Sequence, residues 1–177
     1  MKRIKSMSQA ELAAYIQDAL HSEGIHVVLS GGSAVSFYSG DQYVSKDLDL
    51  VNTGFARRSK IKSIMETLGF TEKGRYFLHH ETTLFVEFPD GPLSVGEEPV
   101  AEVSEFELST GTLKVLSPTD CVKDRLCAFY FWNDLQGLEQ AVLVAKSQAV
   151  DLKEVKRWSK VEGKEFEYKR FEKKLSD

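Results

Sequence analysis

The sequence is poor in cysteine and contains no long apolar run. Its two cysteines, Cys121 and Cys127, lie six residues apart on one expected helix and on different faces of it, which argues against a disulfide. A zinc site would need more ligands than these two thiols. No apolar stretch approaches the roughly 20 residues that span a bilayer, and none follows the basic N-terminus as a leader sequence would require. We therefore expect a cytoplasmic protein with no membrane partner.

Neither charge nor hydrophobicity dominates the composition. Of 177 residues, 42% are hydrophobic and 28% are charged, which is typical of a soluble globular chain and excludes a wholly disordered or collagen-like one. The net charge of −4 argues against indiscriminate binding of duplex nucleic acid. The length fits one domain, or one domain with a helical appendage.

Helical and strand-like patterns alternate over the first two thirds of the chain. Ser8 and Glu11 form the pattern of a capping box that opens a helix, and Gly24 is a plausible stop. Residues 57–68 repeat apolar side chains at helical spacing. The expected strands cover residues 25–29, 47–51, 75–80, 83–88, 103–108 and 113–116, with loop at 94–99. This order predicts an α/β (α+β) fold, a mixed β-sheet flanked by helices, over residues 1–116.

From Ser117 onward the pattern is entirely helical. Ser117 precedes a proline, an arrangement that favours a helix start. Further helices are expected over 134–149 and from Asp151, whereas residues 162–175 are charged and only marginally helical. Phe129, Trp132 and Trp158 recur at helical spacing and are expected in the core. We assign residues 117–177 to a C-terminal helical region packed on the first domain.

Three short features carry chemistry. The first is the turn Gly31-Gly32-Ser33 between an expected strand and a short helix, where glycines allow a sharp bend and helix N–H groups suit a phosphate. A purely structural turn explains this feature equally well. The second is Asp47-Leu48-Asp49, because residues i and i+2 of a strand face the same way and two carboxylates converge on a divalent cation.

The third feature is Glu87, an acid inside the apolar segment Leu84–Phe88. An isolated buried carboxylate costs free energy, so Glu87 needs a partner, an exposed position or a metal shared with Asp47 and Asp49. A solvated polar edge is the alternative reading of the Asp-Leu-Asp pattern. Each signal is weak alone, and the argument rests on their order and spacing.

Taken together, the turn, the Asp47–Asp49 pair and Glu87 resemble the signature of the DNA polymerase β-like nucleotidyltransferase superfamily. The resemblance covers residues 25–90, with Gly32 and Ser33 in the turn and Glu87 in the place of the third acid. Within the superfamily the chain is similar to AbiEii-like and other small bacterial nucleotidyltransferases, several of them toxins. Their helical region opens with a proline and a lysine, which Lys123 matches. A later acid matches either Asp134 or Asp151.

The resemblance implies a metal-dependent transfer of a nucleoside monophosphate from a nucleoside triphosphate (NTP) to an acceptor hydroxyl. It implies Mg²⁺ or Mn²⁺ held by Asp47, Asp49 and Glu87, with phosphates bound by Gly31, Gly32 and Ser33. Lys123 would neutralise phosphate charge. The acceptor could be a tRNA, a protein or a small molecule such as an aminoglycoside, and the chain length and the AbiEii-like likeness favour RNA or protein. An antitoxin-like partner is implied if the chain is a toxin.

An inactive module that binds a nucleotide or a protein is the alternative function. The departure that favours it is the third acid, which is glutamate rather than aspartate. Glutamate has a longer side chain and still offers Mg²⁺ the oxygen ligands that the ion prefers. The sequence leaves open the nucleotide, the acceptor and the oligomeric state.

Overall fold

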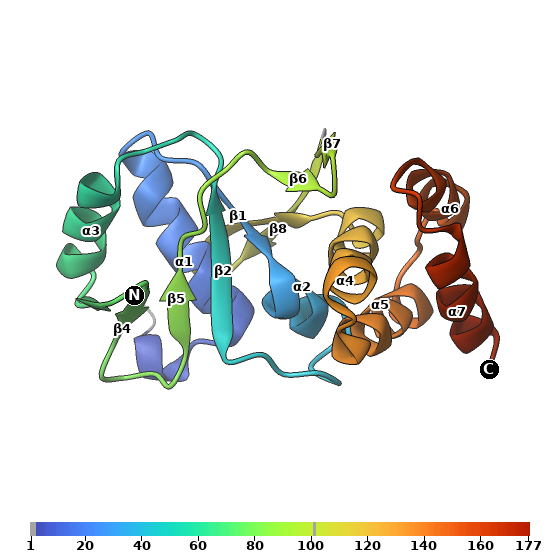
Figure 1. Cartoon of the computed structure of the whole chain (residues 1–177). Coiled ribbons are helices and arrows are strands. Elements are labelled where there is room, and N and C mark those ends of the chain that lie inside the picture. The colour runs from blue at the N-terminus through green and yellow to red at the C-terminus, as the bar shows by residue number, and fades with distance from the viewer. Residues whose placement is uncertain (1–2, 101) are drawn as a thin grey trace.

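The computed structural model describes residues 3–100 and 102–177, which form a mixed sheet with flanking helices followed by a helical region (Figure 1). The elements in chain order are η1 (Ile4–Ser6), α1 (Gln9–Ser22), β1 (Val27–Ser30), α2 (Gly31–Tyr38), β2 (Asp47–Asn52), α3 (Arg58–Thr67), β3 (Thr71–Lys73), β4 (Tyr76–Leu78), β5 (Phe85–Glu87), β6 (Ser94–Val95), β7 (Glu98–Pro99), β8 (Val103–Leu108), β9 (Gly111–Leu116), α4 (Pro118–Trp132), α5 (Leu135–Ser147), α6 (Leu152–Val161) and α7 (Glu165–Ser176).

The main sheet has the strand order β3-β4-β5-β2-β1-β9-β8. At its centre β2 runs antiparallel to β1 and parallel to β5, and β1 runs parallel to β9. The short α2 follows β1 directly, so the chain turns sharply at the end of a central strand. The predicted α/β (α+β) class, a mixed sheet flanked by helices, is confirmed.

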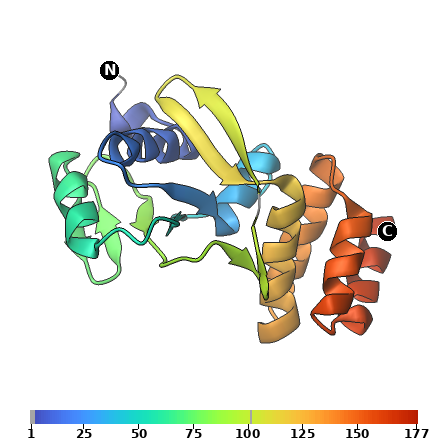
Figure 2. The same ribbon diagram turned by 90° about the horizontal axis from the view of Figure 1, so that it is seen from above.

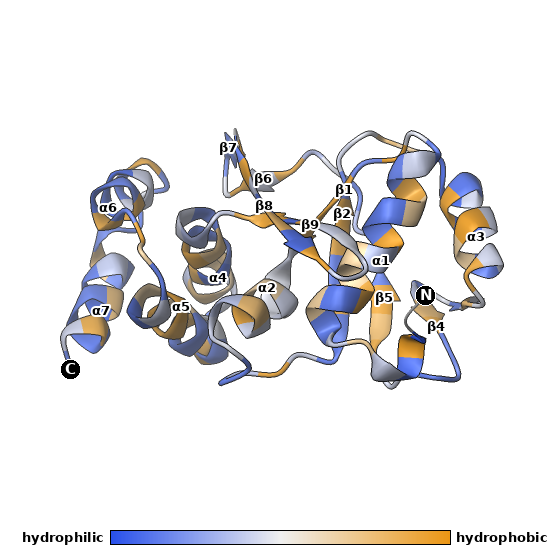
Figure 3. Ribbon diagram, turned by 180° about the vertical axis from the view of Figure 1, so that it is seen from behind, coloured by the Kyte–Doolittle hydropathy of each residue, from blue (hydrophilic) through white to orange (hydrophobic). Residues whose placement is uncertain are grey.

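The two faces of the central strands differ. Helices α1 and α3 lie over one face, as the view from behind shows (Figure 3), and Leu48 and Leu50 of β2 are fully buried on that side. No helix covers the opposite face of β2 and β5 in the front view or in the view from above (Figures 1 and 2). Because side chains alternate along a strand, Asp47 and Asp49 belong to this second face.

The two predicted helix starts are confirmed. The Ser8 hydroxyl accepts from the backbone N–H of Glu11, whose side chain accepts from the backbone N–H of Ser8. The Ser117 hydroxyl accepts from the N–H of Asp120, and Pro118 occupies the first turn of α4. Both caps satisfy donors that a helix leaves unpaired at its N-terminus.

The helical region is tied to the sheet by buried side chains. Trp158 of α6 is fully buried, and its indole N–H donates to the Val95 carbonyl at 3.1 Å. Tyr168 and Phe171 are buried on one face of α7. This burial stabilises a helix in the charged C-terminal segment, which the sequence pattern alone had predicted to be only marginally helical. One hydrophobic core runs through both parts of the chain, so the division at residue 116 stays a prediction.

Two expectations about local structure are wrong. The segment expected as a loop at 94–99 forms the two-stranded hairpin β6–β7. The hairpin contacts Trp158, whose indole N–H donates to its Val95 carbonyl. Trp132, expected in the core, is 83% exposed because it is the last residue of α4, where Asn133 turns into the left-handed region and ends the helix. Both cysteines are free, as expected. Among the described residues, no helix is both long and apolar enough to cross a membrane.

Candidate active site

The glycine turn lies directly under one of the predicted carboxylates. Gly31 has a φ of +64°, a left-handed conformation that glycine adopts without strain. A Cβ at this position would collide with the carboxylate oxygen Oδ2 of Asp49. At Gly32 a Cβ would lie 3.1 Å from the Ser45 hydroxyl. The two glycines therefore allow β2 to approach the turn, and Gly31 fixes where the Asp49 side chain lies.

The Ser33 hydroxyl faces inward and holds β2. It donates to the backbone carbonyl of Asp47, and the side chain of Ser33 is almost fully buried. The Gln9 side-chain amide donates to the Ser33 oxygen at 3.1 Å and to the Ser45 carbonyl at 2.8 Å. In this arrangement Ser33 positions an aspartate rather than presenting its hydroxyl to a phosphate.

The structure brings the three predicted carboxylates to neighbouring positions of the sheet. Asp49 of β2 stands opposite Glu87 of β5 in the parallel ladder, and Asp47 lies two residues earlier on the same face of β2. The pKa of Asp49 is raised to about 6, first by burial and then by the negative charges of Glu87 and Asp47. The three acids therefore form one electrostatic group.

Two arginines carry positive charge near these acids. Arg75, in the turn between β3 and β4, places its Nε 3.5 Å from the Glu87 carboxylate and is largely exposed. Arg125 of α4 is mostly buried and lowers the pKa of Asp49 against the larger raising effects. The Arg125 guanidinium also donates to Asp124 at 2.6 Å and to Gln140 at 3.3 Å.

Lys123 lies elsewhere and is already paired. Its ammonium group is 2.7 Å from Glu154 and 3.5 Å from Asp120, and its side chain is 6% exposed. It lines a pocket between the β6–β7 hairpin and the N-terminal ends of α4 and α6, and none of the three predicted carboxylates lines that pocket. The structure does not bring Lys123 together with the aspartate pair.

The two candidates for a later acid are both helix caps. Asp134 accepts from the backbone N–H of Gln136 at the start of α5, and Asp151 accepts from that of Glu154 at the start of α6. Capping accounts for both carboxylates. Asp151 in addition lines the pocket that contains Lys123.

Arg125 and Gln9 were not predicted from the sequence. Lys123, Asp124 and Arg125 are consecutive on α4, and successive helix residues point about 100° apart. Only one cation of this run can face the sheet, and the apolar pattern of α4 is too irregular to say which one. For Gln9 there was no signal, because a glutamine in the first turn of a helix is usually solvated.

The donor set fits a hard divalent cation. Carboxylate oxygens are the ligands that Mg²⁺ prefers, and the repulsion that raises the Asp49 pKa is what a cation would relieve. Over residues 3–100 and 102–177, however, no three His, Cys, Asp or Glu side chains are already gathered around a common point for a metal. Mg²⁺ at nucleotide sites is held by one or two carboxylates together with substrate phosphates, so a pair such as Asp47 and Asp49 would be enough protein ligands for such a site.

Comparison with solved structures identifies the fold. The chain resembles ANT(2'')-Ia in complex with adenylyl-2''-tobramycin, with a TM-score of 0.53 and 19% identity over 85% of this chain and 94% of that one. A solution structure of the antibiotic-resistance factor ANT(2'')-Ia gives a TM-score of 0.51 and 18% identity, covering 92% of this chain and 91% of that one. The chain has the nucleotidyltransferase fold.

A third structure supports the same conclusion. An antigenic nucleotidyltransferase-like protein from Paracoccidioides brasiliensis matches with a TM-score of 0.55 and 16% identity, over 77% of this chain and 76% of that one. No protein-family model and no curated protein matches the sequence. At these identities the likeness concerns the fold, so the activity has to be argued from the residues of the site.

Proposed function

We propose that this protein is a metal-dependent nucleotidyltransferase that moves a nucleoside monophosphate from an NTP to an acceptor hydroxyl. One observation carries the proposal: Asp47, Asp49 and Glu87 lie together on the sheet face that none of the described helices covers, and burial together with the charges of Glu87 and Asp47 raises the pKa of Asp49. Maintaining close like charges costs stability, which is typical of functional sites rather than of structural ones.

The roles of the residues follow from their places. Asp47 and Asp49 would hold Mg²⁺ or Mn²⁺, which supplies charge neutralisation for the triphosphate. Glu87, beside Asp49 on the neighbouring strand, would accept the proton of the acceptor hydroxyl. The freed oxygen attacks the α-phosphorus, a new P–O bond forms, and pyrophosphate leaves with the electrons of the broken bond.

Arg125 takes the role that the sequence resemblance gave to Lys123. Each of the two cations is paired with an acid of its own, Arg125 with Asp124 and Lys123 with Glu154, but Arg125 is the α4 cation whose charge acts on Asp49. Its planar guanidinium is suited to a phosphate oxygen pair. Gly31 and Gly32 would let the triphosphate approach the turn closely, while Ser33 acts through the position of Asp47.

A small-molecule hydroxyl is the acceptor that we favour. ANT(2'')-Ia, whose fold this chain shares, has been solved with an adenylylated antibiotic. A tRNA end or a protein side chain is the alternative acceptor, and the AbiEii-like resemblance with its toxin role and antitoxin-like partner stays a prediction. Co-purification of a second protein that suppresses transfer would support the toxin role.

The test is nucleotide transfer under matched conditions. The purified chain is incubated with Mg²⁺ and each of the four α-³²P-labelled NTPs, together with an aminoglycoside panel, total tRNA or a protein extract. The Asp47→Asn and Asp49→Asn variants should lose the label transfer, while Asp151→Asn, which alters an acid outside the group, should keep it. Transfer that is equal in all three variants would contradict the proposal.

A second function, an inactive nucleotide-binding module, is favoured by the contact between Arg75 and Glu87. An arginine that stays on Glu87 occupies the carboxylate that a metal ion or an acceptor hydroxyl would have to reach. This alternative expects NTP to raise the melting temperature of the wild type without any transfer to any acceptor. It also expects the Arg75→Gln variant to remain inactive.

A further inference from the structure

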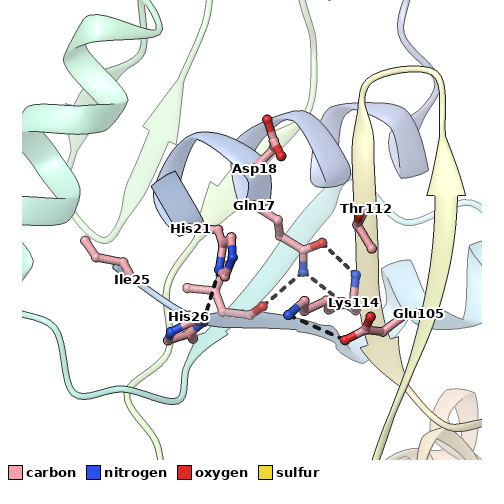
Figure 4. A pocket seen from close by; sticks show the side chains of 9 residues that line it. Gln17, Asp18, His21, Ile25, His26, Glu105, Thr112 and Lys114 are labelled. Atoms are coloured by element: carbon pink, nitrogen blue, oxygen red, sulfur yellow. Dashed lines mark hydrogen bonds and ion pairs between the residues drawn. The ribbon is translucent and has the colours of Figure 1, made fainter. Parts of the chain in front are cut away.

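A pair of histidines lies on the far side of the sheet from the aspartates. His21 lies in the last turn of α1 and His26 immediately precedes β1, and their rings lean toward one another at the rim of a pocket (Figure 4). The two Nδ1 atoms are 3.3 Å apart, and the ring planes meet at 62°. Both side chains are exposed to solvent, so an ion can reach them from outside.

The separation of the two nitrogens matches a shared metal ion. Zinc binds histidine nitrogen at about 2.0–2.1 Å with tetrahedral geometry, which places two nitrogen ligands about 3.3–3.4 Å apart. An octahedral ion with the same bond lengths would bring adjacent nitrogens to about 2.9–3.0 Å. Without an ion the same separation holds a hydrogen bond between the two rings, in which one neutral imidazole donates and the other accepts, and an ion bound by both Nδ1 atoms would replace that bond.

The backbone on both sides of the pair is fixed. The Gly24 N–H donates to the His21 carbonyl at 2.9 Å, and the Thr53 N–H donates to the His26 carbonyl at 3.1 Å. Gly24 adopts a φ of +75° in the turn that joins the two histidines. Because these bonds hold both Cα positions, little ordering is left to be done when an ion binds.

The pocket leaves room for further ligands. It measures about 250 Å³, and its floor is formed by Gln17, whose amide donates to the carbonyls of Val27 and Lys114 at 3.1 and 2.7 Å. Asp18, one helical turn before His21, also lines it and makes no hydrogen bond or ion pair with any described residue. Its carboxylate points away from the histidines in Figure 4 and would have to change rotamer to join them.

We propose that His21 and His26 bind a divalent transition-metal ion of the zinc type, with water and the carboxylate of Asp18 completing a tetrahedral shell. Imidazole is a preferred ligand of such ions, whereas Mg²⁺ prefers the oxygen ligands of the aspartate face. The bound ion joins the end of α1 to the start of β1. The site is independent of the proposed transferase activity.

Titration with Zn²⁺ and Co²⁺ tests the site. The chain is used without a polyhistidine tag and with Asp47→Asn and Asp49→Asn introduced, so that the aspartate face contributes no competing ion. Calorimetry should give one ion per chain, and the Co²⁺ complex should show the intense visible absorption of tetrahedral coordination. His21→Asn and His26→Asn should each weaken binding by about tenfold or more, which is the loss of about 1.4 kcal/mol.

The other two histidines supply a matched control. His79 and His80 are stacked with ring centroids 4.6 Å apart and an angle of 23° between planes, which does not direct two nitrogens at one ion. The double variant His79→Asn/His80→Asn should therefore bind Zn²⁺ as the parent does. Asp18→Asn should give a smaller loss than either substitution at the pair.

Three results would overturn the proposal. They are no Zn²⁺ binding to the parent, binding that survives the His21→Asn/His26→Asn double variant, and a thiolate-to-Co²⁺ charge-transfer band that assigns the ion to Cys127. Circular dichroism checks that each variant is folded, which is expected because both histidines lie on the surface. Nucleotide transfer by the chain without these substitutions is measured separately, so the two proposals can fail independently.

Discussion

Asp49 on the sheet and Glu154 in the helical region are carboxylates with opposite electrostatic surroundings. Burial and two neighbouring acids raise the pKa of Asp49 to about 6. Hydrogen bonds from Arg157 and then from Lys123 lower the pKa of Glu154 to about 2. Glu154 belongs to a paired cluster, because Arg157 also forms two hydrogen bonds to Glu98.

The comparison separates charges that stabilise the fold from charges held for a ligand. Acids paired with cations inside the protein contribute to stability near neutral pH and have no capacity left for an ion. Acids held against one another lower stability and attract a cation. By this criterion we expect the pocket around Lys123 to be structural, and the group around Asp49 is the one that we propose to be functional.

Substitution of Asp49 should have the largest effect. We expect Asp49→Asn to lower nucleotide transfer by about a thousandfold or more, because a charged ligand of the reacting centre is lost. The same variant should be more stable than wild type at pH 7, by about 2–3 kcal/mol. Activity assays and urea unfolding of the same preparations measure the two effects.

The pH dependence gives the sign of the Asp49 contribution. Its pKa is higher in the folded than in the unfolded state, so the folded protein takes up a proton first as the pH falls. The stability advantage of Asp49→Asn should therefore be complete at pH 7 and disappear between about pH 6 and 4. An advantage that persists at pH 4 would contradict the assigned environment.

Gly31→Ala should affect stability and activity together. The substitution strains a residue at φ +64° and drives a methyl group into the Asp49 carboxylate, for an expected loss of about 2–4 kcal/mol. Gly40→Ala is the control, because Gly40 has a φ of +60° with nothing within 4 Å of an added Cβ. It should lose about 1 kcal/mol and keep its activity, and equal losses in both variants would argue against a clash at Gly31.

Glu154→Gln should destabilise the protein without removing activity. Lys123 is almost fully buried and would keep only Asp120, so we expect a loss of about 1–2 kcal/mol after allowing for solvent screening. Because its pKa is lowered, Glu154 stabilises the fold above about pH 4.5 and loses that contribution as the pH falls toward 2. Unfolding curves of wild type and variant should therefore converge in acid.

Arg75→Gln should have the smallest effect on stability, within about 0.5 kcal/mol, because its ion pair with Glu87 is exposed to solvent. The variant removes the positive charge of Arg75 beside Glu87 and should bind Mg²⁺ more tightly than wild type. Calorimetric titration measures that affinity. Unchanged affinity would show that Arg75 does not compete with a cation.

Much of the fold could be read from local patterns. The serine caps, Pro118 and the alternation of β2 specify backbone geometry within a few residues, so these features were predicted correctly. The β6–β7 hairpin was not, because its strands have two residues each and depend on packing against Trp158. Trp132 was misplaced because helical periodicity does not say where a helix extends beyond its neighbours.

Within the candidate site, the sequence could predict only which side chains of one strand share a face. A period of two fixed the common face of Asp47 and Asp49, and the strand order given by the structure then placed Glu87 beside them. The pairing of Lys123 with Glu154 joins residues 31 positions apart, and the sequence carries no local sign of it. Likewise the inward turn of the Ser33 hydroxyl depends on Gln9 and Asp47.

The indole bond from Trp158 to Val95 has a practical consequence for anyone dissecting this chain. A version ending after α5 would lose Trp158 and Glu154 at once, which uncovers Val95 of the hairpin and leaves the Lys123 ammonium group with Asp120, 3.5 Å away, as its remaining ion-pair partner. Trimming to an isolated sheet domain should thus give insoluble material. Insertions or circular permutations at exposed loop tips should preserve solubility better than truncation.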